Sequence, residues 1–130
     1  MNKNRIRIPT ILSFAAIVEI CTGLALLIDP RIVVAWLMGP NAPVEQIPMA
    51  RFPGIAILAL GIACWPRRQQ ADSGSPAFRA MLVYNVLIAL FLVYLATVGH
   101  LGGVLLWPGI APHAVVALLL VWTWRLSGRR

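Results

Sequence analysis

The sequence PTILSFAAIVEICTGLALLI, residues 9–28, is almost wholly apolar and carries one carboxylate, Glu19, near its middle. A helix of about 20 residues at 1.5 Å per residue spans roughly 30 Å, the thickness of the hydrocarbon core of a bilayer. We therefore predict that residues 9–28 form a membrane-spanning helix.

Further apolar runs follow at residues 49–65, 80–98 and 110–124. The run at 49–65 is at the short end for a spanning helix. The last run is interrupted by prolines and glycine, so we expect a regular helix only from about residue 110, preceded by an irregular segment. The apolar stretch 32–38 is too short to cross and is expected to lie at the outer interface or to re-enter the membrane.

These runs predict an all-α membrane protein with one domain over residues 1–130. Its four transmembrane helices would form an up-down-up-down bundle, with short apolar interfacial segments on the outer side. The composition agrees, because 60% of the residues are hydrophobic, 12% are charged and the mean hydropathy is +0.84. A soluble domain carries about a quarter charged residues.

The net charge of +7 is concentrated beside the apolar runs. We therefore interpret it as a topology signal and as contacts with anionic lipids, and expect the bilayer, not nucleic acid, as the partner. Nine of the eleven basic residues precede the first run, separate the second from the third, or follow the fourth. The two exceptions are Arg31 and Arg51. The positive-inside rule then places both termini in the cytoplasm.

Glu19 is the polar residue most out of place, about 15 Å from the inner edge and close to the membrane midplane. An ionised carboxylate there is costly, so Glu19 is expected to be protonated, paired or facing a hydrated cavity. Ala15, Ala16, Thr22 and Gly23 share its helix face, and small residues favour close packing. Glu19 is therefore expected to face the bundle interior.

The depths of other polar residues indicate which of them are neighbours. His113 would lie about 16 Å from the inner edge, at nearly the depth of Glu19, and Asn85 about 9 Å in. Side chains lean toward the N-terminus of their own helix, so Glu19 and Arg51 would lean apart. Asp29, at the outer end of the first span, is the more natural neighbour for Arg51 at the interface.

Two interpretations of Glu19, Asn85 and His113 are open. They could relay protons or hold a cation. Alternatively, they hydrogen-bond between helices and fix the packing, at roughly 0.6 to 2 kcal/mol per contact.

The sequence contains no nucleophile–base arrangement, phosphate loop or dinucleotide motif. His100, His113, Glu45 and Asp29 match no metal-ligand spacing. We therefore expect no enzymatic activity, no cofactor and no bound metal.

The run from Arg51 to Gly61 has the pattern R-x-x-G-x-x-x-L-x-x-G, and Asn85 stands within Tyr84-Asn85-Val86. In these motifs, length and layout, the chain resembles small bacterial four-helix membrane proteins of unknown function, which are loosely DoxX-like. The resemblance implies a multi-pass bundle in the bacterial inner (plasma) membrane and carries no established activity.

Val18-Glu19-Ile20 with Thr22 is similar to the first helix of small multidrug resistance transporters, which carries an essential glutamate. Those proteins have tight loops and a weak charge bias, whereas here an outer connection of about 20 residues and a strong bias are present. Their aromatic-rich third-helix site has no counterpart around Asn85.

These observations favour a non-enzymatic accessory or scaffold protein, with other membrane proteins or a second copy of the chain as candidate partners. The alternative is a proton-coupled exporter of small molecules, or a small channel, that uses Glu19 and His113.

Overall fold

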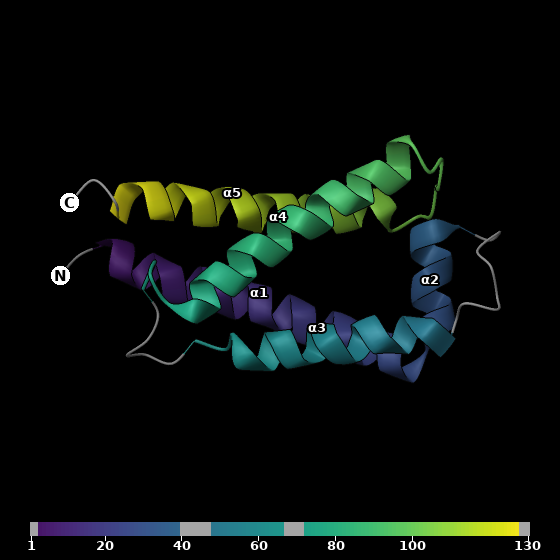
Figure 1. Ribbon diagram of the computed structural model, residues 1–130, viewed down its shortest axis with the longest axis horizontal. Coiled ribbons are helices and arrows are strands. Elements are labelled where there is room, and N and C mark those ends of the chain that lie inside the picture. Colours follow the sequence, from purple (N-terminus) through teal and green to yellow (C-terminus); the bar gives the residue numbers. More distant parts are fainter. Residues whose placement is uncertain (1–2, 40–47, 67–71, 128–130) are drawn as a thin grey trace.

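A computed structural model describes residues 3–39, 48–66 and 72–127, and these residues form helices without any strand. In chain order the elements are α1 (Lys3–Ile28), α2 (Pro30–Met38), a 3₁₀ turn (Pro48–Ala50), α3 (Arg51–Ala63), α4 (Pro76–Thr97) and α5 (Leu106–Ser127) (Figure 1). Three helices are long and apolar enough to cross a membrane, namely α4, α5 and residues Ile8–Ile28 of α1. The chain is therefore an all-helical protein with the character of a membrane protein.

Helix α3 is shorter than the predicted span 49–65. It has 13 residues, which correspond to roughly 20 Å. The 3₁₀ turn Pro48–Ala50 takes up its predicted start, and the helix ends where the Cys64 N–H donates to the Leu60 carbonyl at 2.9 Å. The described residues thus include three helices of spanning length, together with the shorter apolar helix α3.

Helix α5 begins at Leu106 rather than near residue 110, so the last four residues of the predicted irregular segment are helical. Pro108 falls in the first turn, where a backbone N–H has no partner within the helix and its loss costs little. Pro112 lies inside the helix and removes one hydrogen bond without ending it. The prolines therefore shift the start of the helix far less than expected.

Residues 30–38 form the short helix α2, which runs across the end of the bundle instead of along it (Figure 1). Asp29 begins this helix, because its side chain accepts a hydrogen bond from the Arg31 N–H at 3.1 Å. Pro30 occupies the first helical turn, where its fixed φ suits a helix start. A capping residue followed by proline thus turns the chain sharply at the end of α1.

The segment before α5 is hydrogen-bonded to the end of α2. The Gly103 N–H donates to the Leu37 carbonyl at 3.2 Å, and the Leu105 N–H donates to the Trp36 carbonyl at 2.8 Å. A Cβ at Gly103 would overlap the backbone of Trp36 and Leu37, so only glycine fits there. These contacts join α2, which follows α1, to the segment that links α4 to α5.

Helix α1 packs mainly against α3 and α4 against α5, while α1 makes fewer contacts with α4 and α5. Glycines allow the close approach of α1 and α3. A Cβ at Gly23 would lie 2.6 Å from the Leu58 nitrogen, and one at Gly61 would lie 3.0 Å from the Ala16 carbonyl oxygen. Gly54 and Gly61 of α3 thus pack closely against α1.

Two apolar clusters form the core. The larger lies toward the start of α1 and the end of α5 and includes Leu12, Met81 and Leu120. The smaller consists of Leu92, Leu106 and Ile110, from the other halves of α4 and α5. Along α4 and α5, the polar residues Asn85 and His113 stand between these two clusters.

We predict that Gly23→Ala destabilises the protein by about 1 to 3 kcal/mol, because the new methyl group meets backbone atoms of α3 that cannot move aside. Thermal unfolding in detergent measures the effect. Gly102→Ala is the control, since a Cβ there meets nothing within 4 Å. Equal melting temperatures for the two variants would contradict this account of α1–α3 packing.

Candidate functional site

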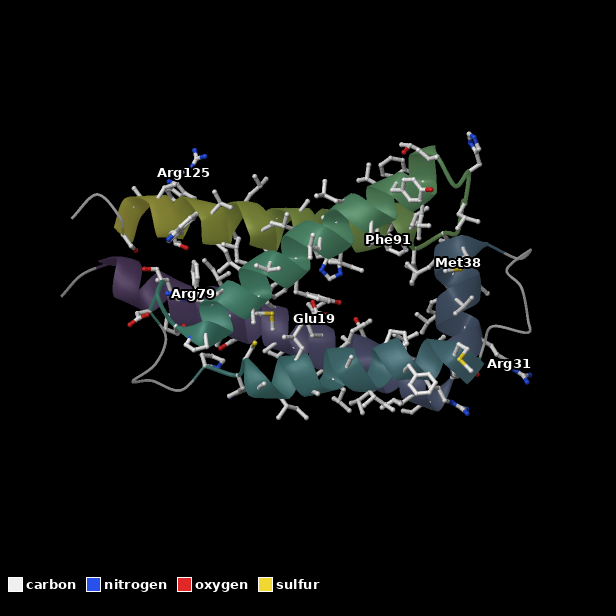
Figure 2. All side chains as sticks on the ribbon, in the orientation of Figure 1. Glu19, Arg31, Met38, Arg79, Phe91 and Arg125 are labelled. Atoms are coloured by element: carbon white, nitrogen blue, oxygen red, sulfur yellow. The ribbon has the colours of Figure 1, made fainter. Side chains whose placement is uncertain are left out.

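Glu19 lies in the interior of the bundle, midway along α1 (Figure 2). The residue is only 1% exposed, and neither carboxyl oxygen has a hydrogen-bond partner among the described residues. Buried polar atoms normally find partners, because an unsatisfied one keeps the full cost of its lost hydration. An unsatisfied carboxyl group at this depth is therefore the most unusual chemical feature of the bundle.

His113 of α5 is a chargeable neighbour of Glu19. Its Nδ1 lies 3.7 Å from Glu19 Oε1, and its side chain is 12% exposed. This separation is short enough for a strong electrostatic interaction and longer than a hydrogen bond. The two residues predicted to share a depth are thus in direct proximity.

Asn85 of α4 completes the contact between helices. Its Nδ2 donates to the Met81 carbonyl at 2.8 Å, and its Oδ1 lies 3.0 Å from His113 Nδ1. An amide oxygen only accepts, so His113 Nδ1 bears a hydrogen in this geometry, and this N–H donates a hydrogen bond to Asn85 Oδ1. Glu19 Oε1 is then a second, more distant acceptor for the same N–H.

Tyr84 belongs to this site although its position in the sequence did not identify it. Its ring meets the His113 ring edge to face, with centroids 5.9 Å apart and planes at 78°. Its phenol also interacts electrostatically with the Glu19 carboxyl group, without completing a hydrogen bond to either oxygen. The available signal was a phenol next to Asn85 within the predicted span 80–98.

The structure therefore brings together Glu19, Asn85 and His113 and adds Tyr84. We call these four residues the polar cluster. They come from α1, α4 and α5, and apolar side chains cover them toward both ends of the bundle. The polar cluster offers a carboxyl group, an imidazole and a phenol within a water-poor interior, which is chemistry suited to holding a proton or a small cation.

The two predicted interfacial residues do not join the polar cluster. Asp29 caps α2, and Arg51 is exposed at the start of α3. No ion pair links them within the described part of the chain. The Asp29 carboxylate instead accepts a hydrogen bond from the backbone N–H two residues further along the chain.

Within the described residues, Asp29 and His100 do not form a metal-binding group with His113. His100 lies in the connection before α5, and Glu45 lies outside the described residues. Among the residues that the structure describes, no group of three His, Cys, Asp or Glu side chains could hold a metal ion.

Comparisons of the chain with models of known families, with curated proteins and with solved structures find no match. The resemblances to DoxX-like proteins and to small multidrug resistance transporters stay predictions.

We predict that Asn85 and His113 are energetically coupled by about 0.5 to 3 kcal/mol in a double-mutant cycle of Asn85→Leu and His113→Phe, because each change removes the partner of the other. Unfolding free energies in detergent supply the four corners of the cycle. Thr97→Val is the control, since its hydroxyl bonds only to Val93 in its own helix. Additive effects of Asn85→Leu and His113→Phe would contradict the observed contact.

Proposed function

We propose that the chain is a multi-pass protein of the bacterial inner membrane, with four spans and both termini in the cytoplasm. The start of α1 and the end of α5 lie at one end of the bundle, together with Arg79 and Arg125, whereas Arg31 lies at the opposite end (Figure 2). This distribution supports the predicted orientation. Helix α3 serves as a short fourth span, and α2 lies at the outer interface.

Within this bundle the polar cluster acts as a proton-binding site, and the protein is a proton-coupled exporter or a small channel. The observation that carries this proposal is the Glu19 carboxyl group, which is 1% exposed and without a hydrogen bond, at 3.7 Å from His113. A glutamate that served only as a packing group would satisfy its oxygens, since a partly satisfied buried network is worse than an apolar one.

The geometry suggests how a proton changes the structure. A protonated Glu19 is neutral and tolerates its apolar surroundings. When the proton leaves, the new charge favours a shorter contact with the His113 N–H or with the Tyr84 hydroxyl. Because α1 makes only limited contact with α4 and α5, this contact can tighten by moving one helix pair against the other. Proton binding is thereby coupled to helix packing.

The second candidate function is an accessory or scaffold protein. The observation that favours it is the hydrogen bond between His113 and the side-chain oxygen of Asn85, which joins α4 to α5, while the Asn85 amide nitrogen donates to the Met81 carbonyl. Such a bond fixes packing without any exchange of protons. In this case Glu19 would act only through its shape and polarity.

We predict that infrared spectra of the protein in lipid vesicles contain a carboxylic acid C=O band that changes in intensity between about pH 5 and pH 9. Glu19→Gln should remove this band, because an amide of the same size takes up no proton. Asp29→Asn, which alters an acid outside the polar cluster, should leave the band intact. A spectrum that is the same in the wild type and in Glu19→Gln would contradict proton binding and favour the scaffold.

Proton flux tests the channel form directly. We expect a potassium diffusion potential to drive protons into vesicles containing the wild type faster than into vesicles containing Glu19→Gln, because only the wild type has a group that accepts and releases protons mid-membrane. A trapped pH-sensitive dye reports the flux. Identical flux in wild-type and protein-free vesicles would rule out a proton channel.

A further inference from the structure

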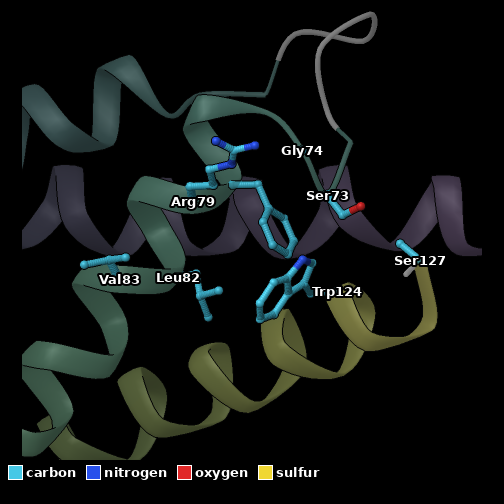
Figure 3. Close-up of a pocket in the computed structure, with 8 residues that line it drawn as sticks. Ser73, Gly74, Arg79, Leu82, Val83, Trp124 and Ser127 are labelled. Atoms are coloured by element: carbon cyan, nitrogen blue, oxygen red, sulfur yellow. The ribbon is translucent and has the colours of Figure 1, made fainter. Parts of the chain in front are cut away.

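A pocket of about 480 Å³ lies between the start of α4 and the end of α5, and none of the residues that line it belongs to the polar cluster (Figure 3). Arg79 stands on its α4 side, Trp124 and Ser127 on its α5 side, and Ser73 and Gly74 in the turn that leads into α4. This is the end of the bundle that carries Arg79 and Arg125, which the orientation proposed above assigns to the cytoplasmic leaflet (Figure 2).

The mouth of the pocket presents hydrogen-bond donors. Arg79 is exposed and forms no ion pair within the described part of the chain. The Trp124 indole N–H, on the ring edge turned toward α4 in Figure 3, and the Ser73 hydroxyl likewise have no hydrogen bond among the described residues. A guanidinium fork with two neutral donors suits a phosphate group.

The remaining polar groups around the mouth are already committed. The Ser127 hydroxyl donates to the Thr123 carbonyl at 2.9 Å. The nearest acid, Asp72, accepts the Gly74 N–H at 2.8 Å and so has a backbone partner within its own turn. Arg79 is the charged side chain among the residues that line the pocket, and Asp72, which does not line it, forms no ion pair with Arg79 within the described part of the chain.

The floor of the pocket is apolar and opens toward the side of the bundle. Phe78 is buried beneath it, and Leu82 and Val83 continue it along α4. One turn further, Leu87 is 61% exposed on the outer surface of α4. A ligand with a phosphate at the mouth would thus have an apolar track, running into the membrane, for an attached hydrocarbon chain.

We propose that this pocket binds the headgroup of an anionic phospholipid of the cytoplasmic leaflet, with its phosphate at Arg79, Trp124 and Ser73 and an acyl chain along Leu82 and Val83. A free phosphate would use only the mouth and leave the apolar floor uncovered. The inference depends on the proposed orientation and is independent of proton binding at Glu19.

Native mass spectrometry of the detergent-solubilised protein tests the proposal, with phosphatidylglycerol, phosphatidylcholine and inorganic phosphate as probes. We expect the wild type to retain phosphatidylglycerol in preference to phosphatidylcholine. Arg79→Gln should lower the affinity for phosphatidylglycerol about tenfold, as the loss of a hydrogen bond to a charged group implies. Arg125→Gln, at the same end but outside the pocket, should leave the affinity unchanged.

Three results would overturn the proposal. Equal retention of the two lipids removes the preference for an anionic headgroup. Equal losses in Arg79→Gln and Arg125→Gln show a general effect of surface charge. Displacement of the lipid by inorganic phosphate at an equal concentration shows a site for free anions.

Trp124→Phe gives a second measure, because it keeps the ring and removes one donor, and it should weaken binding of phosphatidylglycerol. Glu19→Gln should bind this lipid like the wild type, which separates a failure of the lipid site from a failure of the proton site.

Discussion

The bundle is built around a carboxyl group that is buried without a hydrogen bond. Burying Glu19 in the middle of α1 costs free energy, and apolar packing alone does not offset this cost. Polar groups are therefore needed on the helices that face it. Asn85 and His113 meet at 3.0 Å beside it and leave one N–H within 3.7 Å of its oxygen. The contact that joins α4 to α5 is thus also the contact that leaves Glu19 incompletely paired.

Helix packing divides the molecule into a tight part and a looser part. Between α1 and α3 the backbones approach so closely at Gly23 and Gly61 that a methyl group does not fit. Between α1 and the α4–α5 pair the contacts are fewer and include the polar cluster. Interfaces held by backbone contact cannot adjust, whereas side-chain hydrogen bonds can be exchanged. Any response to protonation is therefore expected at the polar cluster and not between α1 and α3.

Hydrophobic length identified the three long helices and the short non-crossing segment at residues 32–38, because these features depend on local composition. Helix ends were predicted less well. Pro108 indicated an irregular segment, yet a proline in the first turn costs little, and α5 begins at Leu106. Depth arguments brought Glu19 and His113 together but not Tyr84, whose position depends on how α4 is rotated about its axis. The depth arguments also did not predict the contact of Gly103 with α2, because this contact joins segments more than 60 residues apart in the sequence.

Helix α4 contributes residues to both proposed sites. The two sites differ in their exposure to water. Asn85 is 1% exposed and makes short contacts in a water-poor layer, where a single missing partner is costly. Arg79 is exposed at the start of the same helix, where water already satisfies its guanidinium and a phosphate gains only the difference. Removing Arg79 therefore leaves no buried group unsatisfied, whereas changing Glu19, Asn85 or His113 alters a buried contact of the polar cluster. For this reason the lipid site can be altered without disturbing the bundle, while variants of the polar cluster need stability measurements alongside any test of proton binding.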